Sequence, residues 1–177
     1  MLQQVGDNSK QPSSDSMIVI FMGVAGSGKT TVGERLAKEL GWQFYDGDQF
    51  HPPANIAKMR RGEPLDDADR AGWLMALRNL IDTLIAAGKS GVIACSALKQ
   101  VYREQLLAND RIVKFIYLKG SYEAIHKRMA TRQGHYFKTE LLASQFAVLE
   151  EPTNAIVVDA SLPANETVTL IRRTLAN

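Results

Sequence analysis

The sequence has little of several features that mark particular classes of protein. Its 177 residues include one cysteine, Cys95, so no internal disulfide can form, which fits a reducing compartment such as the cytoplasm. No apolar run approaches the roughly 20 residues that a membrane-spanning helix needs. The net charge is only +2, without the clustered basic face that nucleic-acid binding requires. We therefore expect a cytoplasmic protein with no membrane span and no nucleic-acid partner.

The chain is expected to contain one folded unit. Residues 1–16 are polar and have no apolar region of signal-peptide type, so we expect a disordered N-terminal extension there. Apolar residues make up 45% of the sequence and charged residues 23%, which is ordinary for a globular protein. Neither an internal repeat nor a linker interrupts the remainder. The sequence therefore predicts a single domain over residues 17–177.

Short apolar segments alternate with segments of helical periodicity. The first kind has the composition of buried strands and comprises residues 17–22, 42–46, 91–95, 112–118 and 155–159. The second kind predicts helices at residues 30–40, 66–87, 99–109, 122–129, 139–151 and 168–175. Strands that alternate with helices imply right-handed crossovers. The predicted fold class is α/β, a doubly wound five-stranded parallel sheet with helices on both faces.

The segment "GVAGSGKT" at residues 23–30 matches the complete P-loop pattern and lies between a predicted strand and a predicted helix. We expect its backbone amides and the following helix N-terminus to bind nucleotide phosphates. Lys29 would reach the β and γ phosphates, and the Thr30 hydroxyl would bind Mg²⁺. The nucleotide-binding residues are then Gly23, Val24, Ala25, Gly26, Ser27, Gly28, Lys29 and Thr30. The alternative is a glycine-rich turn with a chance lysine.

Two signals of other P-loop proteins are missing. No N-K-x-D motif, which reads guanine in GTPases, occurs in the chain. The third predicted strand ends in Cys95 and Ser96, without the aspartate that often helps to hold the metal. The metal would then depend on Thr30, phosphate oxygens and water, with Asp46 assisting.

The segment "DGD" places two carboxylates, Asp46 and Asp48, directly after the second predicted strand. Ligands of doubly wound sheets bind at the carboxyl ends of the strands, so both should open onto the same cleft as the P-loop. Phosphoryl transfer to an alcohol needs a group that orients the hydroxyl and accepts its proton. We assign this role to Asp48 and place Asp46 nearer the metal. The alternative is a solvated turn.

Basic residues follow in two groups. Lys58 and Arg70 supply positive charge beyond the aspartates, which can bind an anionic acceptor or form a solvated face. Arg128 and Arg132 are four residues apart and precede a glycine, which predicts a basic lid around residues 128–138. Plain surface charge is the alternative for each arginine. His51, held before two prolines, and His135 are candidate substrate contacts; for His51, a packed or exposed histidine is the alternative.

Together, "GVAGSGKT", "DGDQFHPPANIAKMRRGEPLDDADRAGWL", "CSALKQVYR", "FIYLKG" and "RMATRQGHYFK" resemble the bacterial gluconokinases of the small P-loop type. The resemblance runs from about residue 17 to the C-terminus. It implies the P-loop kinase fold of nucleoside monophosphate kinases and shikimate kinase. It also implies MgATP-dependent phosphorylation of D-gluconate at its terminal hydroxyl, and a homodimer.

The resemblance also implies roles for individual residues. Asp48 would face the acceptor hydroxyl, and Arg128 and Arg132 would be the lid arginines. His51, Lys58, Arg70 and His135 become candidate gluconate contacts. The chain departs from the family pattern at Gly72, where such proteins often have proline, and this change removes no reactive group.

Two further functions stay open at this point. Shikimate kinase and nucleoside monophosphate kinases have the same fold, and an Asp-x-Asp pair suits a shikimate acceptor as well as gluconate. A monophosphate acceptor would need its own arginine cluster, which "DGDQFHPP" does not supply. A non-catalytic ATP sensor is a different class of function, which would bind nucleotide without acceptor-dependent turnover.

Overall fold

The computed structural model describes residues 16–131 and 140–176, and within them the chain forms one parallel sheet. The sheet has 5 strands in the order β2-β3-β1-β4-β5. The strands are β1 (Ile18–Met22), β2 (Gln43–Asp46), β3 (Gly91–Ala94), β4 (Val113–Lys119) and β5 (Ile156–Asp159). Every neighbouring pair is parallel. The predicted α/β fold class is confirmed.

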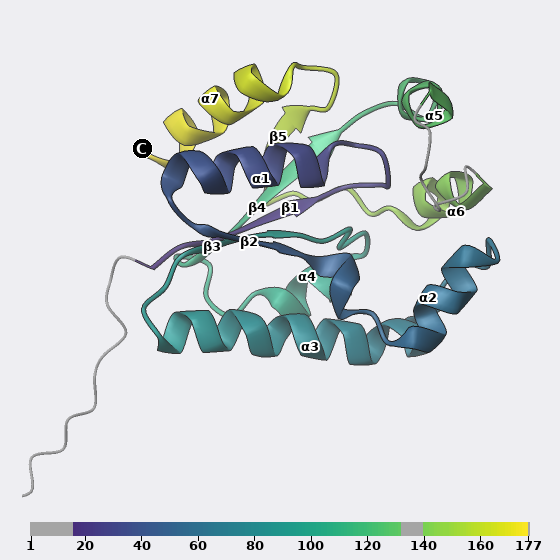
Figure 1. The fold of residues 1–177 in the computed structure, drawn as a ribbon, viewed down its shortest axis with the longest axis horizontal. Helices are drawn as coiled ribbons and strands as arrows, with labels where there is room; N and C mark the ends of the chain where they lie inside the picture. Colours follow the sequence, from purple (N-terminus) through teal and green to yellow (C-terminus); the bar gives the residue numbers. More distant parts are fainter. Residues whose placement is uncertain (1–15, 132–139, 177) are drawn as a thin grey trace, which may run out of the picture.

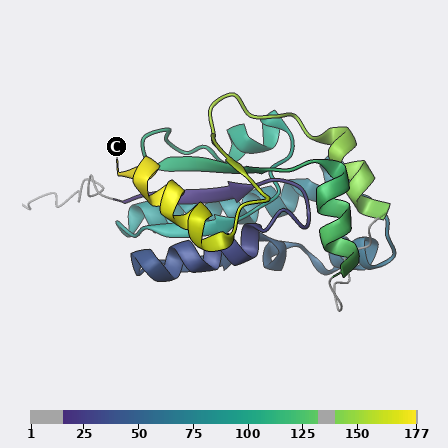
Figure 2. The same cartoon turned by 90° about the horizontal axis from the view of Figure 1, so that it is seen from above.

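Helices cover both faces of the sheet and gather beyond one of its ends. They are α1 (Lys29–Leu40), α2 (Pro53–Arg60), α3 (Asp67–Ala86), α4 (Gln100–Leu106), α5 (Tyr122–Thr131), α6 (Glu140–Val148) and α7 (Ala164–Leu175), with a 3₁₀ helix, η1 (Gly47–Phe50). In Figure 1, α1 and α7 lie on one face of the sheet and α3 and α4 on the other. Figures 1 and 2 agree that α5 and α6 lie beyond one end. The sequence did not predict α2 or η1.

The apolar core consists of two layers, one on each face of the sheet. All five residues of β1 are buried, as expected for a strand at the centre of a parallel sheet. On one face they pack with Leu36 of α1 and Ile171 of α7. On the other they pack with Trp73, Leu77 and Ile81 of α3. These layers fix the strand ends, where the P-loop begins.

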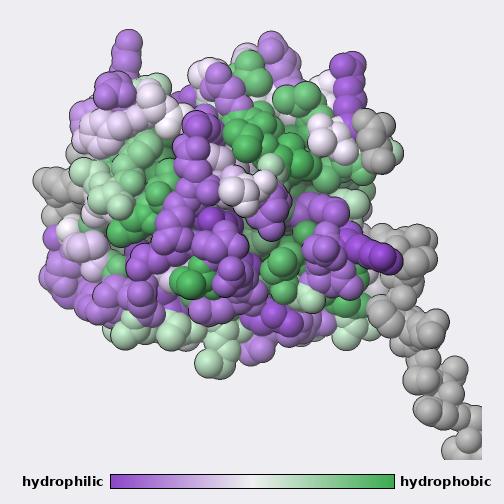
Figure 3. Space-filling model, turned by 180° about the vertical axis from the view of Figure 1, so that it is seen from behind, coloured by the Kyte–Doolittle hydropathy of each residue, from purple (hydrophilic) through white to green (hydrophobic). Residues whose placement is uncertain are grey.

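The surface is mixed in character. Figure 3 shows apolar side chains on the rear face in patches separated by hydrophilic ones. Within residues 16–131 and 140–176, none of the helices combines the length and the apolar composition needed to cross a membrane. The expected N-terminal extension falls outside the described residues apart from Ser16, which is buried, so its disorder stays a prediction.

Candidate active site

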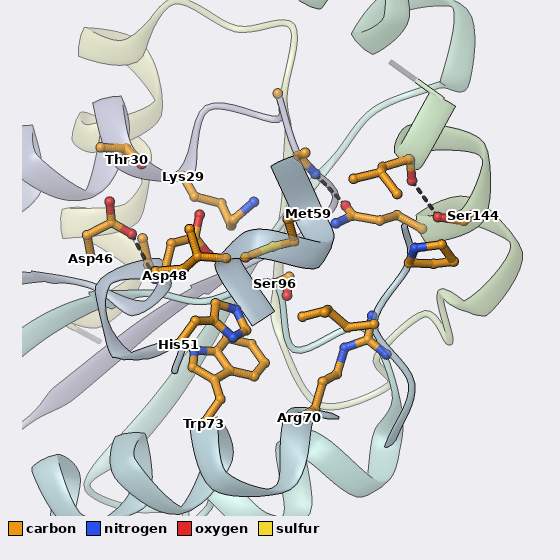
Figure 4. Close-up of a pocket in the computed structure, with 18 of the residues that line it drawn as sticks. Lys29, Thr30, Asp46, Asp48, His51, Met59, Arg70, Trp73, Ser96 and Ser144 are labelled. Carbon is orange, nitrogen blue, oxygen red and sulfur yellow. Dashed lines mark hydrogen bonds between the residues drawn. The ribbon is translucent and has the colours of Figure 1, made fainter. Parts of the chain in front are cut away.

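A cavity of about 840 Å³ opens at the carboxyl ends of the strands (Figure 4). The P-loop, η1, α2, the first turns of α3 and helix α6 contribute to its walls. Nine of the predicted site residues line it, namely Ala25, Gly26, Gly28, Lys29, Thr30, Asp46, Asp48, His51 and Arg70. The fold thus brings the phosphate-binding motif and the aspartate pair to one cavity, as the sequence predicted.

The P-loop has the backbone geometry that its glycines permit. Gly23, Gly26 and Gly28 have φ angles of 137°, 76° and 101°. Residues that carry a Cβ atom rarely adopt these angles. The Lys29 ammonium donates to the carbonyl oxygens of Gly23 and Val24, at 2.9 Å each. Burial lowers the pKa of Lys29, while the negative charge of Asp48 acts in the opposite direction. An anion in the cavity would favour the charged form of this lysine.

The two aspartates of "DGD" have different environments. The Asp46 carboxylate accepts a hydrogen bond of 3.0 Å from the backbone N–H of Asp48 and caps η1. Burial raises the pKa of Asp46, and the hydrogen bond from Asp48 partly offsets this effect. The Asp48 side chain is exposed to the cavity and lies beside Lys29 (Figure 4). One carboxylate oxygen of Asp46 is thus used within the turn, whereas the Asp48 carboxylate faces the cavity.

Gly47 holds the aspartate pair against the sheet. A Cβ atom at this position would lie 2.4 Å from the carbonyl oxygen of Ala94, so only glycine fits between η1 and β3. The indole N–H of Trp73 donates to the Gly47 carbonyl oxygen at 2.7 Å. Sequence reasoning missed both residues, although the glycine between the aspartates and the tryptophan of the long helix were visible signals. Together they fix where Asp48 stands.

His51 is a buried residue at the cavity wall. Its ring stacks on Trp73, with the ring centroids 4.3 Å apart and an interplanar angle of 14°. Its Nδ1 atom lies 3.2 Å from the side-chain nitrogen of Asn55. Burial and the nearby charge of Arg70 lower the pKa of His51 to about 4. The imidazole is therefore neutral near pH 7.

The structure separates the two basic residues proposed as gluconate contacts. Arg70 lines the cavity and donates to the Tyr102 hydroxyl at 3.2 Å. Lys58 does not line it, because its ammonium bonds to both carboxylate oxygens of Asp69, at 2.9 and 2.8 Å. Lys58 thus connects α2 to α3, and its contact with substrate stays a prediction.

The lid arginines are only partly described. The Arg128 guanidinium donates to the carbonyl oxygen of Ala160 at 2.6 Å and to those of Gly26 and Ser27 at 3.4 Å. Arg128 therefore contacts the P-loop backbone but is not among the residues that line the cavity. Arg132 and His135 lie outside the described residues.

Helix α6 contributes a contact that sequence reasoning missed. The Gln145 side-chain oxygen accepts a hydrogen bond of 2.7 Å from the backbone N–H of Ala25 in the P-loop. A backbone N–H can only donate, so the Gln145 oxygen must face it and the amide nitrogen is left for another partner. Gln145 lines the cavity, and no motif around it signals this role.

Comparisons with known proteins identify the family. The shikimate kinase family model matches residues 25–174. The thermoresistant gluconokinase of Escherichia coli (strain K12) is 44% identical over 153 residues, which cover 84% of this chain and 87% of that protein. The chain belongs to the gluconokinase family.

Solved structures agree with this assignment. A gluconokinase from Sinorhizobium meliloti 1021 superposes with a TM-score of 0.80 at 40% identity, covering 91% of each chain. Shikimate kinase from Aquifex aeolicus vf5 superposes with a TM-score of 0.58 at 19% identity, covering 90% of this chain and 96% of that one. At that identity the second match shows the shared fold alone. The gluconokinase family and its P-loop kinase fold are thus both established for this chain.

Proposed function

We propose that the protein transfers the γ-phosphoryl group of ATP to the terminal hydroxyl of D-gluconate. The observation that carries this proposal is the position of Asp48, whose exposed carboxylate shares a cavity with Lys29 and Thr30 of the P-loop. Phosphoryl transfer needs an anionic group beside the acceptor and a cationic group beside the phosphates. The gluconokinase relatives supply the substrate for the proposal.

The P-loop and Asp48 would have different roles in the reaction. P-loop amides and the N-terminus of α1 would hold the phosphates, with the Lys29 ammonium turning from its loop carbonyls toward them. Asp48 would orient the hydroxyl and accept its proton. The hydroxyl oxygen forms a new bond to the γ phosphorus, and the bond from that phosphorus to the bridging oxygen of ADP breaks. ADP and 6-phospho-D-gluconate are the products.

The donor set beside the P-loop fits Mg²⁺. The Thr30 hydroxyl and the Asp46 carboxylate are hard oxygen ligands, and both line the cavity. Across the described residues, no group of three or more His, Cys, Asp or Glu side chains could hold a metal by itself. Phosphate oxygens and water would therefore complete the coordination. When bound, the ion would neutralise charge on the phosphates.

The acceptor end of the cavity suits a polyhydroxy acid. Arg70 offers a guanidinium for a carboxylate, and His51 offers a ring nitrogen for an oxygen. Lys58 would act indirectly, by holding α2 in place. Arg128 and Arg132 are proposed as lid arginines and His135 as a substrate contact. A homodimer and a cytoplasmic location complete the proposal, supported by the family resemblance and by the lone buried Cys95.

The test is ADP release from MgATP with D-gluconate, shikimate or AMP offered separately. The shikimate arm is included because that family model matches the chain. We expect turnover with gluconate alone and a loss of about 100-fold or more in Asp48→Asn. Turnover with shikimate or AMP in place of gluconate would contradict the substrate. Gluconate turnover that survives the substitution would remove Asp48 as the proton acceptor.

A further inference from the structure

Asn55 is a buried polar residue with two partners and no place in the reaction described above. It is the only buried residue of α2, with 3% of its surface exposed. Its side-chain nitrogen lies 2.7 Å from the backbone carbonyl oxygen of Asp69 and 3.2 Å from Nδ1 of His51. Both contacts involve the same amide nitrogen, and this determines the chemistry of the histidine ring.

The orientation of the Asn55 amide follows from the Asp69 carbonyl. A carbonyl oxygen can only accept hydrogen bonds, so the NH₂ group must face it and the amide oxygen cannot. The second N–H of the same group then points at Nδ1 of His51. Nδ1 must accept this hydrogen bond, so it carries no proton. In a neutral imidazole the proton is then on Nε2.

The surroundings of His51 keep this tautomer neutral and fixed in direction. Trp73 of α3 stacks on the ring and is itself held by its hydrogen bond to the Gly47 carbonyl oxygen. The charged group that acts on His51 is Arg70 of α3, whose positive charge opposes a second proton. Asn55 and Trp73 are uncharged. Nδ1 of the ring thus accepts a hydrogen bond from Asn55, and Nε2–H is left as the donor.

We infer that Asn55 is a positioning residue that fixes His51 as an Nε2–H donor to an oxygen of the acceptor substrate. The inference rests on the proposed function for the identity of that substrate. The geometry alone supports the tautomer, because it depends only on the Asn55 amide and the Asp69 carbonyl oxygen. An oxygen can accept from Nε2–H, whereas an ammonium group at the same place could not.

The first experiment reads the tautomer without any activity. Long-range ¹H–¹⁵N spectra of the imidazole rings would be recorded on the full chain near neutral pH. The sequence contains three histidines, so a His51→Gln sample identifies the His51 signals by their absence. We expect the Nε2–H tautomer for His51. An Nδ1–H tautomer or an imidazolium would overturn the inference even if gluconate turnover is confirmed.

The second experiment changes the partner with Asn55→Asp, which keeps the shape and removes the N–H donor. A carboxylate at this position would accept a hydrogen bond from Nδ1–H, so the neutral ring would carry its proton on Nδ1 and none on Nε2. We expect KM for gluconate to rise about 10-fold, with smaller changes in kcat and in KM for ATP. If Asn55→Asp does not fold, the wild-type spectrum still tests the inference, because it shows directly which nitrogen of His51 carries the proton.

Acidification distinguishes positioning from a merely structural role. The new carboxylate favours the imidazolium and so raises the pKa of His51, which restores a proton on Nε2 at about pH 6. The ratio of variant to wild-type KM for gluconate should therefore fall toward 1 at that pH. A ratio that stays constant or grows on acidification would contradict the assignment. The spectra would show the tautomer of His51 even in a protein without gluconate turnover. A failure of the proposed function can therefore be distinguished from a failure of this inference.

Discussion

The two walls of the cavity are held in place by different forces. The P-loop wall continues from β1, whose five residues are completely buried between two apolar layers. The α2 wall, Pro53–Arg60, buries only Asn55 and is tied to the first turn of α3 through Asp69. The phosphate end therefore rests on hydrophobic burial, whereas the acceptor end rests on hydrogen bonds and an ion pair.

This difference has consequences for how each wall responds to solution conditions. Hydrophobic burial does not titrate, but the contacts of Asp69 depend on the ionisation of its carboxylate. Segments with few buried apolar contacts open at lower free energy than the global core. We expect the α2 wall to loosen before the P-loop wall does. The following substitutions test this contrast.

Lys29→Met should have the largest effect on activity. It removes the cation beside the transferring phosphate, and losses of about 100-fold to 1000-fold in kcat are typical for such groups. The melting temperature should hold or rise, because burial disfavours the charged form of Lys29. Steady-state kinetics and thermal unfolding measure both.

The matched control is Lys58→Met on the other wall. This lysine bonds to Asp69 and does not line the cavity, so we expect a few-fold change, mainly in KM for gluconate. An equal loss of kcat in the two variants would show that the walls do not differ in the way described. A loss confined to Lys58→Met would assign it a direct role in the reaction.

Asp69→Asn should lower stability in a pH-dependent manner. The hydrogen bonds from Lys58 lower the pKa of Asp69, with a contribution from the backbone N–H of Asp66. A lowered pKa means that the ionised carboxylate stabilises the fold at neutral pH, and this stabilisation disappears as the pH falls through the folded pKa. The variant should melt a few degrees below the wild type at pH 7, with the difference shrinking toward pH 3. A difference that widens on acidification would contradict this assignment.

Gly72→Ala should give the smallest effect, a gain in stability. Gly72 lies inside α3, and a Cβ atom there would meet no atom within 4 Å. Replacing a helical glycine by alanine contributes roughly 0.5–1 kcal/mol to the free energy of unfolding. Gly33→Ala in α1 is the control, because its Cβ would lie 2.8 Å from the Phe44 ring. Urea unfolding should show the gain only in Gly72→Ala, and equal changes would contradict the packing argument.

The same contrast explains what could be predicted from the sequence. The strands follow from apolar runs, and the first strand and the start of the helix after the P-loop motif were predicted to within one residue. Helix α2 was missed because it has no apolar face, and because the two prolines suggested extended backbone. Pro53 in fact occupies the first turn of α2, where proline is well tolerated.

The polar contacts of the site were less predictable. Asp48 and Arg70 could be placed because the cavity lies at strand ends and because the family resemblance extends over this block. The hydrogen bonds of Asn55, Lys58 and Gln145 join residues on different helices and loops. Sequence patterns describe neighbouring residues and do not indicate such pairs. The bond between Lys58 and the Asp69 carboxylate, for example, could not be predicted from either residue alone.

Asp69 also joins the start of α3 to helix α2. Its carboxylate and backbone complete the capping box at the start of α3, its carboxylate binds Lys58, and its carbonyl oxygen binds Asn55. The last two contacts thus depend on the position that the capping box gives to Asp69. A change that frays the first turn of α3 should therefore also weaken the docking of α2, so the acceptor wall and this helix N-terminus are expected to open together as one unit.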